Sequence, residues 1–281
     1  LYRWQVTNGT ITSGTGTNSI TVQWPNLGAG TLVVTDSIVS GFSHLHLSGT
    51  GIGDLNDILL LPLTGKIALK KATKEDPNGY GSTFSHNNEV VKPGYYSVLL
   101  DKYKVKAELT TSERVGFHKY TFENTNDSHI LIDLADGIGW DRPVKTFIKK
   151  ISETKIEGYR YSTGWASDQR IYFAMEFSEP IINMAVYDST AVVKGTEGEG
   201  LKIKAVLDFK TLKNKQILVK VGISPVSTEN ASANIKAEIP NWDFEKTVKA
   251  ANSKISIVLA SGDSPNEVKR FAFSGFNLNS A

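Results

Sequence analysis

Short runs of alternating apolar and polar residues recur along the chain, and they constrain its fold more than any other feature. Residues 20–24 and 31–35 alternate in this way, and further runs rich in β-branched and aromatic residues are bounded by Gly, Asn, Asp or Pro. A period of two is typical of strands with one buried face. Because the runs are short, numerous and not separated by helical patterns, they predict an antiparallel β-sandwich. The other predicted strands are residues 95–100, 104–109, 115–122, 130–134, 171–177, 181–187, 201–207 and 216–221.

Helical patterns appear near the C-terminal end of the chain. Asn241 can cap a helix over residues 242–252, with apolar side chains spaced to form a stripe. A second helix is predicted to begin at Ser264 and to stop at residues 274–275. Residues 224–233 are interpreted as a linker between the strands and these helices. The predicted fold class is therefore mainly β, with short C-terminal helices.

Composition excludes several classes of protein. The 281 residues carry 31 basic and 29 acidic side chains, and this balance argues against a dedicated nucleic-acid-binding protein. Cysteine is absent, which excludes disulfides, thiolate metal sites and cysteine nucleophiles. No apolar run approaches the length of a membrane span, and the densest, residues 58–63, contains Pro62. The chain begins at Leu1 rather than Met, which indicates a mature form or a fragment.

The first 36 residues differ in composition from the rest of the chain: they are rich in Thr, Ser, Gly and Asn and carry almost no charge. Their motifs YxWxVTNGxI (residues 2–11) and GxGTNSIxVxW (residues 14–24) resemble the PKD-like, immunoglobulin-type modules of secreted Bacteroidetes proteins. The match covers only part of such a module. We therefore expect residues 1–36 to form a partial PKD-like β segment, with a boundary near residues 36–41.

A second resemblance covers roughly residues 41–253. It rests on several motifs in a fixed order: GFSHLHLSGTGxGD (41–54), PGYYSV (93–98), KAELT (106–110), RVGFH (114–118), STGWA (162–166) and QRIYF (169–173). Together they resemble the N-terminal domain of glycoside hydrolase family 92. Several long motifs in the right order make a coincidence improbable.

The family resemblance implies an N-terminal β-supersandwich, here residues 41–240, that packs on a C-terminal (α/α)6 barrel. It also implies calcium-dependent, inverting exo-α-mannosidases of bacterial glycan scavenging, with the active site where the two domains meet. The calcium and both catalytic carboxylates would lie mainly in the barrel, which this sequence does not contain. Residues 241–281 would be a helical linker and a truncated start of the catalytic domain. We therefore expect no cofactor in this chain and no activity from it alone.

A loop at residues 41–57 is the strongest candidate site. Its four glycines permit close approach of a ligand to backbone N–H groups, and its two histidines, two residues apart, would share one face of an extended segment. Such a polar loop suits a sugar, whereas the alternative is a turn that satisfies its own hydrogen bonds. The resemblance favours the first reading, since it implies that this loop lies beside the substrate. The substrate-binding residues predicted in the loop are His44, His46, Ser48, Asp54 and Asp57.

The residues of the same loop also suggest two other chemistries. His44, His46 and Asp54 could supply three ligands to zinc. Asp54 and Asp57 could act as the acid and base of an inverting glycosidase, if they lay far enough apart to admit a water. The resemblance argues against both, so we predict no metal ligand and no catalytic residue in this chain.

Trp140 and Trp165 lie in contexts typical of loops. An aromatic ring on a loop can stack on the face of a sugar, but a loop tryptophan more often plugs the end of a sandwich. Both alternatives stay open for the pair. Trp165 is included among the predicted substrate-binding residues.

The leading hypothesis is an N-terminal carbohydrate-facing domain of a secreted exo-α-mannosidase-like glycosidase. Its partners would be mannose-containing glycans and the missing barrel, with no nucleic acid and no membrane span, and its location would be periplasmic, cell-surface or secreted. The alternative is a stand-alone carbohydrate-binding or structural surface module without catalysis. Sugar binding by the chain itself would favour the carbohydrate-binding module.

Overall fold

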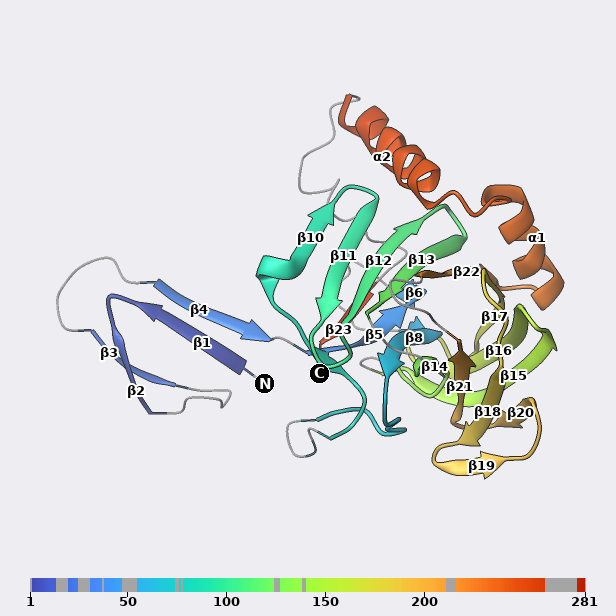
Figure 1. Cartoon of the computed structure of the whole chain (residues 1–281), viewed down its shortest axis with the longest axis horizontal. Helices are drawn as coiled ribbons and strands as arrows, with labels where there is room; N and C mark the ends of the chain where they lie inside the picture. The colour runs from blue at the N-terminus through green and yellow to red at the C-terminus, as the bar shows by residue number, and fades with distance from the viewer. Residues whose placement is uncertain are drawn as a thin grey trace.

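Two large antiparallel sheets make up most of the molecule (Figure 1). The computed structural model describes residues 2–13, 20–24, 31–36, 38–46, 55–73, 76, 78–123, 127–137, 140–210, 216–260 and 277–280. The first sheet has nine strands, in the order β10 (Glu89–Lys92), β11 (Tyr95–Leu100), β12 (Val105–Thr111), β13 (Val115–Phe122), β22 (Gln216–Ser224), β17 (Gln169–Phe177), β16 (Lys155–Thr163), β15 (Arg142–Ser152) and β20 (Glu197–Gly200).

The second sheet has eight strands. Seven lie in the order β19 (Ala191–Val193), β18 (Asn183–Asp188), β21 (Ile203–Phe209), β14 (Ser128–Asp133), β8 (Leu59–Thr64), β5 (Ile38–Ser43) and β23 (Asn277–Ser280), while β9 (Ser82–Thr83) pairs with β5. Its central strands β8 and β14 are buried along almost their whole length. The apolar run at residues 58–63 is thus an interior strand of the sandwich.

The core fills the space between the two sheets. A single buried cluster joins side chains from the nine-stranded sheet, such as Phe173 and Val219, to side chains from the eight-stranded sheet, such as Phe42 and Leu207. Burial of each large apolar side chain contributes about 1.5–3 kcal/mol. Strand β16 shows the underlying pattern, because buried and half-buried residues alternate along its whole length. The predicted mainly β, antiparallel sandwich is confirmed.

Two helices cover part of the outer face of the nine-stranded sheet. Helix α1 (Thr228–Glu238) packs against β22 and β17, and α2 (Phe244–Ala260) lies over β11, β12 and β13. A second buried cluster under these helices includes Phe117 from the sheet, Ile235 from α1 and Phe244 from α2. Among the described residues, no helix is long and apolar enough to cross a membrane.

The interpretation of residues 224–233 as a linker is wrong, since α1 begins at Thr228. The Ser227 side chain accepts a hydrogen bond from the backbone N–H of Asn230, and Ala231 is fully buried against the sheet. The Ser, Thr and Asn residues that resemble a linker therefore form a helix N-terminus. The helix predicted over residues 242–252 exists as α2, whereas the helix predicted from Ser264 lies outside the described residues.

Four strands precede the sandwich. Strand β1 (Tyr2–Thr7) pairs with β4 (Thr31–Asp36), and β2 (Thr10–Ser13) pairs with β3 (Thr21–Gln23). In Figure 1 these strands extend away from the two large sheets. Strands were expected in this segment, while its likeness to a PKD-like module stays a prediction.

Candidate functional site

The stem of the candidate loop is a short hairpin that leaves strand β5. Strand β6 (Leu45–His46) pairs with β7 (Leu55–Asp57), and the backbone N–H of His44 donates to the Asp57 carbonyl at 3.0 Å. Of the predicted substrate-binding residues, Ser48 and Asp54 lie outside the described residues. For His46 only the backbone is described. The structure thus shows how the loop is held at its base.

The His44 side chain points into the protein interior. Its exposed fraction is 4%, its Nδ1 lies 2.6 Å from the Ile58 carbonyl oxygen, and its Nε2 lies 2.7 Å from Nε2 of His118. Because a carbonyl can only accept, Nδ1 carries the proton and Nε2 of His44 accepts a hydrogen bond from His118. Both ring nitrogens therefore have protein partners, and the imidazole anchors the loop base to β8.

The hydrogen bonds continue from His118 to Tyr120, whose hydroxyl lies 2.7 Å from Nδ1 of His118. Burial raises the pKa of Tyr120 well above its usual value, so the hydroxyl keeps its proton and donates. Burial lowers the pKa of His44 to about 4, against the opposing hydrogen bond to Ile58. Burial, with the nearby His44, also holds the pKa of His118 well below its usual value. The three side chains form a neutral, one-directional chain of hydrogen bonds.

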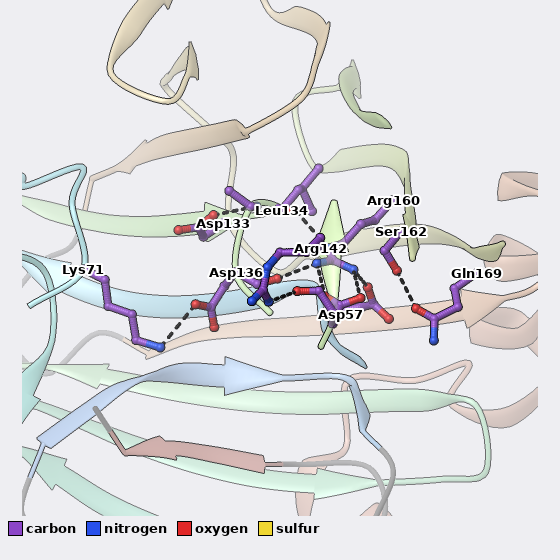
Figure 2. A network of polar contacts seen from close by, with 11 residues as sticks. Asp57, Lys71, Asp133, Leu134, Asp136, Arg142, Arg160, Ser162 and Gln169 are labelled. Atoms are coloured by element: carbon purple, nitrogen blue, oxygen red, sulfur yellow. Dashed lines mark hydrogen bonds and ion pairs between the residues drawn. The ribbon is translucent and has the colours of Figure 1, made fainter. Parts of the chain in front are cut away.

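Asp57, at the other end of the loop, binds a buried arginine (Figure 2). Nη1 of Arg160 contacts Asp57, and Nη2 contacts Asp141; all three side chains are almost completely buried. Burial acts to lower the pKa of Arg160, but the charge of Asp57 and the hydrogen bonds that Arg160 donates to Asp141 outweigh it and raise that pKa. Asp57 is thus half of an ion-pair cluster, and in this position it orders the loop base.

The same guanidinium also fixes the segment between β14 and β15. Nε of Arg160 donates to the Leu134 carbonyl at 2.9 Å, and Nη2 donates to the Asp136 carbonyl at 2.7 Å. Gly137 passes so close that a Cβ there would collide with the carboxylate of Asp141. Arg160 therefore joins the base of the 41–57 loop to the segment that leads to Trp140.

Trp140 and Trp165 stack on each other, with ring centroids 5.9 Å apart and planes 13° from parallel. Each side chain is 61% exposed. A tryptophan that plugs a sandwich end would be buried, so that alternative is wrong for both residues. Among the predicted site residues whose side chains the structure describes (His44, Asp57 and Trp165), Trp165 is the most exposed.

Sequence reasoning missed Arg160, Asp141 and His118 as parts of this site. One signal for Arg160 was present in the sequence. In the alternating strand β16 it occupies an inward-facing position, and the neighbouring inward-facing positions are Gly158 and Ser162. A charged residue at such a position predicts a buried ion pair. The partners Asp57 and Asp141 are far from Arg160 in sequence, so their convergence is a property of the fold.

The described residues do not suit calcium. Calcium prefers six to eight oxygen ligands, and the part of the chain that the structure describes holds no group of three or more acidic or histidine side chains arranged so that it could hold a metal ion. The two buried carboxylates nearest the loop, Asp57 and Asp141, both bind Arg160. The described side chains can position neighbouring segments and can present hydrogen-bonding groups and exposed aromatic rings to a ligand.

Comparison with known proteins identifies relatives with the same fold. The solved structure of a family GH92 α-mannosidase from Bacteroides thetaiotaomicron is 32% identical, with a TM-score of 0.77, over 80% of this chain and 32% of that chain. A family GH92 inverting mannosidase from the same species, at 21% identity and a TM-score of 0.68 over 96% of this chain and 34% of that chain, shares the fold. An uncharacterized secreted glycosidase of Arthroderma benhamiae is 28% identical over 250 residues, which are 77% of this chain and 31% of the relative.

The chain thus spans about a third of the length of the relatives it matches. The family defined as the glycosyl hydrolase family 92 N-terminal domain matches residues 9–224. This match begins inside the segment expected to be PKD-like and covers every strand of both large sheets except β23. On this match and the shared fold, the chain belongs to the glycosyl hydrolase family 92 N-terminal domain family.

Proposed function

We propose that this chain is the carbohydrate-facing N-terminal domain of a secreted exo-α-mannosidase-like glycosidase. In this role it packs on a catalytic domain and supplies one wall of the substrate site. The observation that carries the proposal is membership of the family, together with a chain that spans about a third of its α-mannosidase relative. The secreted location is supported by the description of the Arthroderma benhamiae relative.

The geometry supports a 41–57 loop that is anchored at both ends of its base by buried side chains. His44 anchors one end of the 41–57 loop through the Ile58 carbonyl, and Arg160 anchors the other end through Asp57. Both anchors are buried and their polar groups have protein partners: the first is a neutral imidazole, and the second is a guanidinium shared by Asp57 and Asp141. We assign sugar contacts to His46, Ser48 and Asp54, whose loop these anchors hold, with His44 and Asp57 acting through its shape.

The catalytic acid and base belong, in this proposal, to the other domain. An inverting glycosidase needs two carboxyl groups on opposite sides of the scissile bond, with room for a water. Asp57 is tied to Arg160 in the interior, so it is poorly placed to exchange a proton with substrate. Calcium, if it assists the reaction, is likewise assigned to the other domain.

Hydrolysis assays on the purified chain test whether the catalytic groups belong to the other domain. The chain alone should release no mannose from α-1,2-mannobiose, with calcium or with a chelator present. Addition of a separately purified family 92 catalytic domain should raise the rate above that of the catalytic domain alone. Turnover by the chain alone would show that its own residues complete an active site and would overturn the proposal.

A further inference from the structure

Trp140 and Trp165 form an exposed pair of tryptophans on the surface of the sandwich. We propose that Trp140 and Trp165 form a stacking platform for a pyranose ring, which the chain can use without any other domain. The identity of the ligand as a mannose-containing glycan rests on the proposed function. The platform itself rests on the geometry of the two side chains.

The exposure of the two rings is the first observation. Each indole is 61% exposed although the sandwich has a large buried core. Each Å² of apolar surface that stays in water loses roughly 25 cal/mol of the stabilising free energy that burial would supply. The two rings are near-parallel and offset, since their planes differ by 13° at a centroid separation of 5.9 Å. An offset stack leaves much of the outer face of each indole accessible.

The rigid mounting of both rings is the second observation. Trp140 precedes Asp141, whose carboxylate is fully buried against Arg160. Trp165 sits at the tip of the β16–β17 hairpin, where the Gly164 N–H donates to the Ala166 carbonyl at 2.9 Å. A tryptophan has only two side-chain torsions, so rings mounted in this way lose little entropy when a ligand binds.

The location of the pair is the third observation. Asp57 closes the 41–57 loop and binds the same guanidinium as Asp141, the neighbour of Trp140. The segment that carries Trp140 is therefore tied to the loop base through Arg160. We accordingly assign the pair to a sugar unit beyond the one that the loop contacts.

The polar surroundings match a sugar better than an apolar protein surface. A pyranose presents an apolar C–H face bordered by hydroxyls, and the indoles can take the face while nearby polar groups take the hydroxyls. Arg142 follows Trp140 in the chain and is exposed. On the hairpin that carries Trp165, Asp168 and Arg170 form an exposed ion pair at 2.9 Å. These groups offer both donors and acceptors on the two chain segments that carry the indoles.

Titration of the full 281-residue chain with α-1,2-mannobiose tests the inference. The indole N–H signals of the five tryptophans are followed by NMR, with glycerol as a control for bulk solvent effects. Trp140→Ala and Trp165→Ala are the test variants. Trp24→Ala is the matched control, because Trp24 is 42% exposed and belongs to the N-terminal strands. Thermal melting confirms that each variant is folded, which is expected because all three side chains are exposed.

Saturable shifts centred on the signals of Trp140 and Trp165 are the expected result. Loss of either ring should weaken binding about tenfold, the equivalent of one good aromatic contact, while Trp24→Ala binds as the parent does. The inference is overturned if mannobiose gives no saturable shift, or if all three variants bind equally. If the chain binds sugar at this pair but no reconstituted enzyme hydrolyses mannobiose, the proposed function is wrong and the inference stands. If a reconstituted enzyme hydrolyses mannobiose but the chain binds no sugar at this pair, the inference is wrong and the proposed function stands.

Discussion

Acid should destabilise this chain through the buried histidine at the base of the loop. The pKa of His44 is about 4 in the folded chain, whereas its usual value is 6.5. Between these values the unfolded chain binds a proton that the folded chain does not, so stability falls as pH falls through this window and is full above it. From pH 7.5 to about pH 4.5, the free energy of unfolding should drop by about 2.5 kcal/mol on account of His44.

Urea unfolding followed by tryptophan fluorescence across this pH range measures the effect. Carboxylates also titrate in part of this range, so the informative quantity is the difference between variants. His44→Gln should lose about 2.5 kcal/mol of the pH dependence, even though it is less stable at pH 7.5. His86→Gln is the comparison variant, because the His86 side chain is 60% exposed rather than buried, and the loss attributed to His44 should remain in it.

Direct observation of the imidazole provides a second readout that does not depend on how stable the variant is. In the folded chain, the ring of His44 should stay neutral with its proton on Nδ1 down to about pH 5. Titration of His44 near 6.5 in the folded chain, or an unchanged pH dependence in His44→Gln, would refute the reasoning.

Three further perturbations follow from the structure. Arg160→Met should lower the free energy of unfolding by about 3–5 kcal/mol, because it leaves the buried Asp57 and Asp141 without a cation; Arg170→Met, at an exposed ion pair, should change urea unfolding little. Ser227→Ala should cost about 1 kcal/mol in the same assay, since it removes the N-cap of α1; an unchanged midpoint would argue against this cap. Gly222→Ala should lower the melting temperature and speed proteolysis of α1, because the new Cβ would collide with the Ala231 carbonyl. A variant that resists protease as well as the parent chain does would contradict the close packing of α1 on β22.

The fold class could be predicted because alternation is a local property of each strand. Residues 115–122 and 171–177 alternate clearly, and both are strands of the nine-stranded sheet. Strands β15 and β16 were not predicted from the sequence, although the inward-facing residues of β16 follow the same period of two. Its outward face carries Lys, Glu and Tyr, and such a mixture weakens the contrast between the two faces.

The candidate site was only partly predictable, because its partners come from distant segments. The loop at residues 41–57 stood out by its glycines and histidines. Nothing local to His44 indicates that His118 lies 2.7 Å from it, or that Asp57 meets Arg160. The exposure of Trp140 and Trp165 likewise depends on how two separate loops end beside each other.

A domain exchange tests the central claim most directly. Residues 38–240 of this chain would replace the N-terminal domain of the Bacteroides thetaiotaomicron α-mannosidase that is 32% identical to it. The account predicts that the chimera hydrolyses α-1,2-mannobiose, and that His46→Ala in the chimera lowers kcat/KM. A chimera that melts in one cooperative transition yet releases no mannose would contradict the claim that this chain supplies a wall of the substrate site.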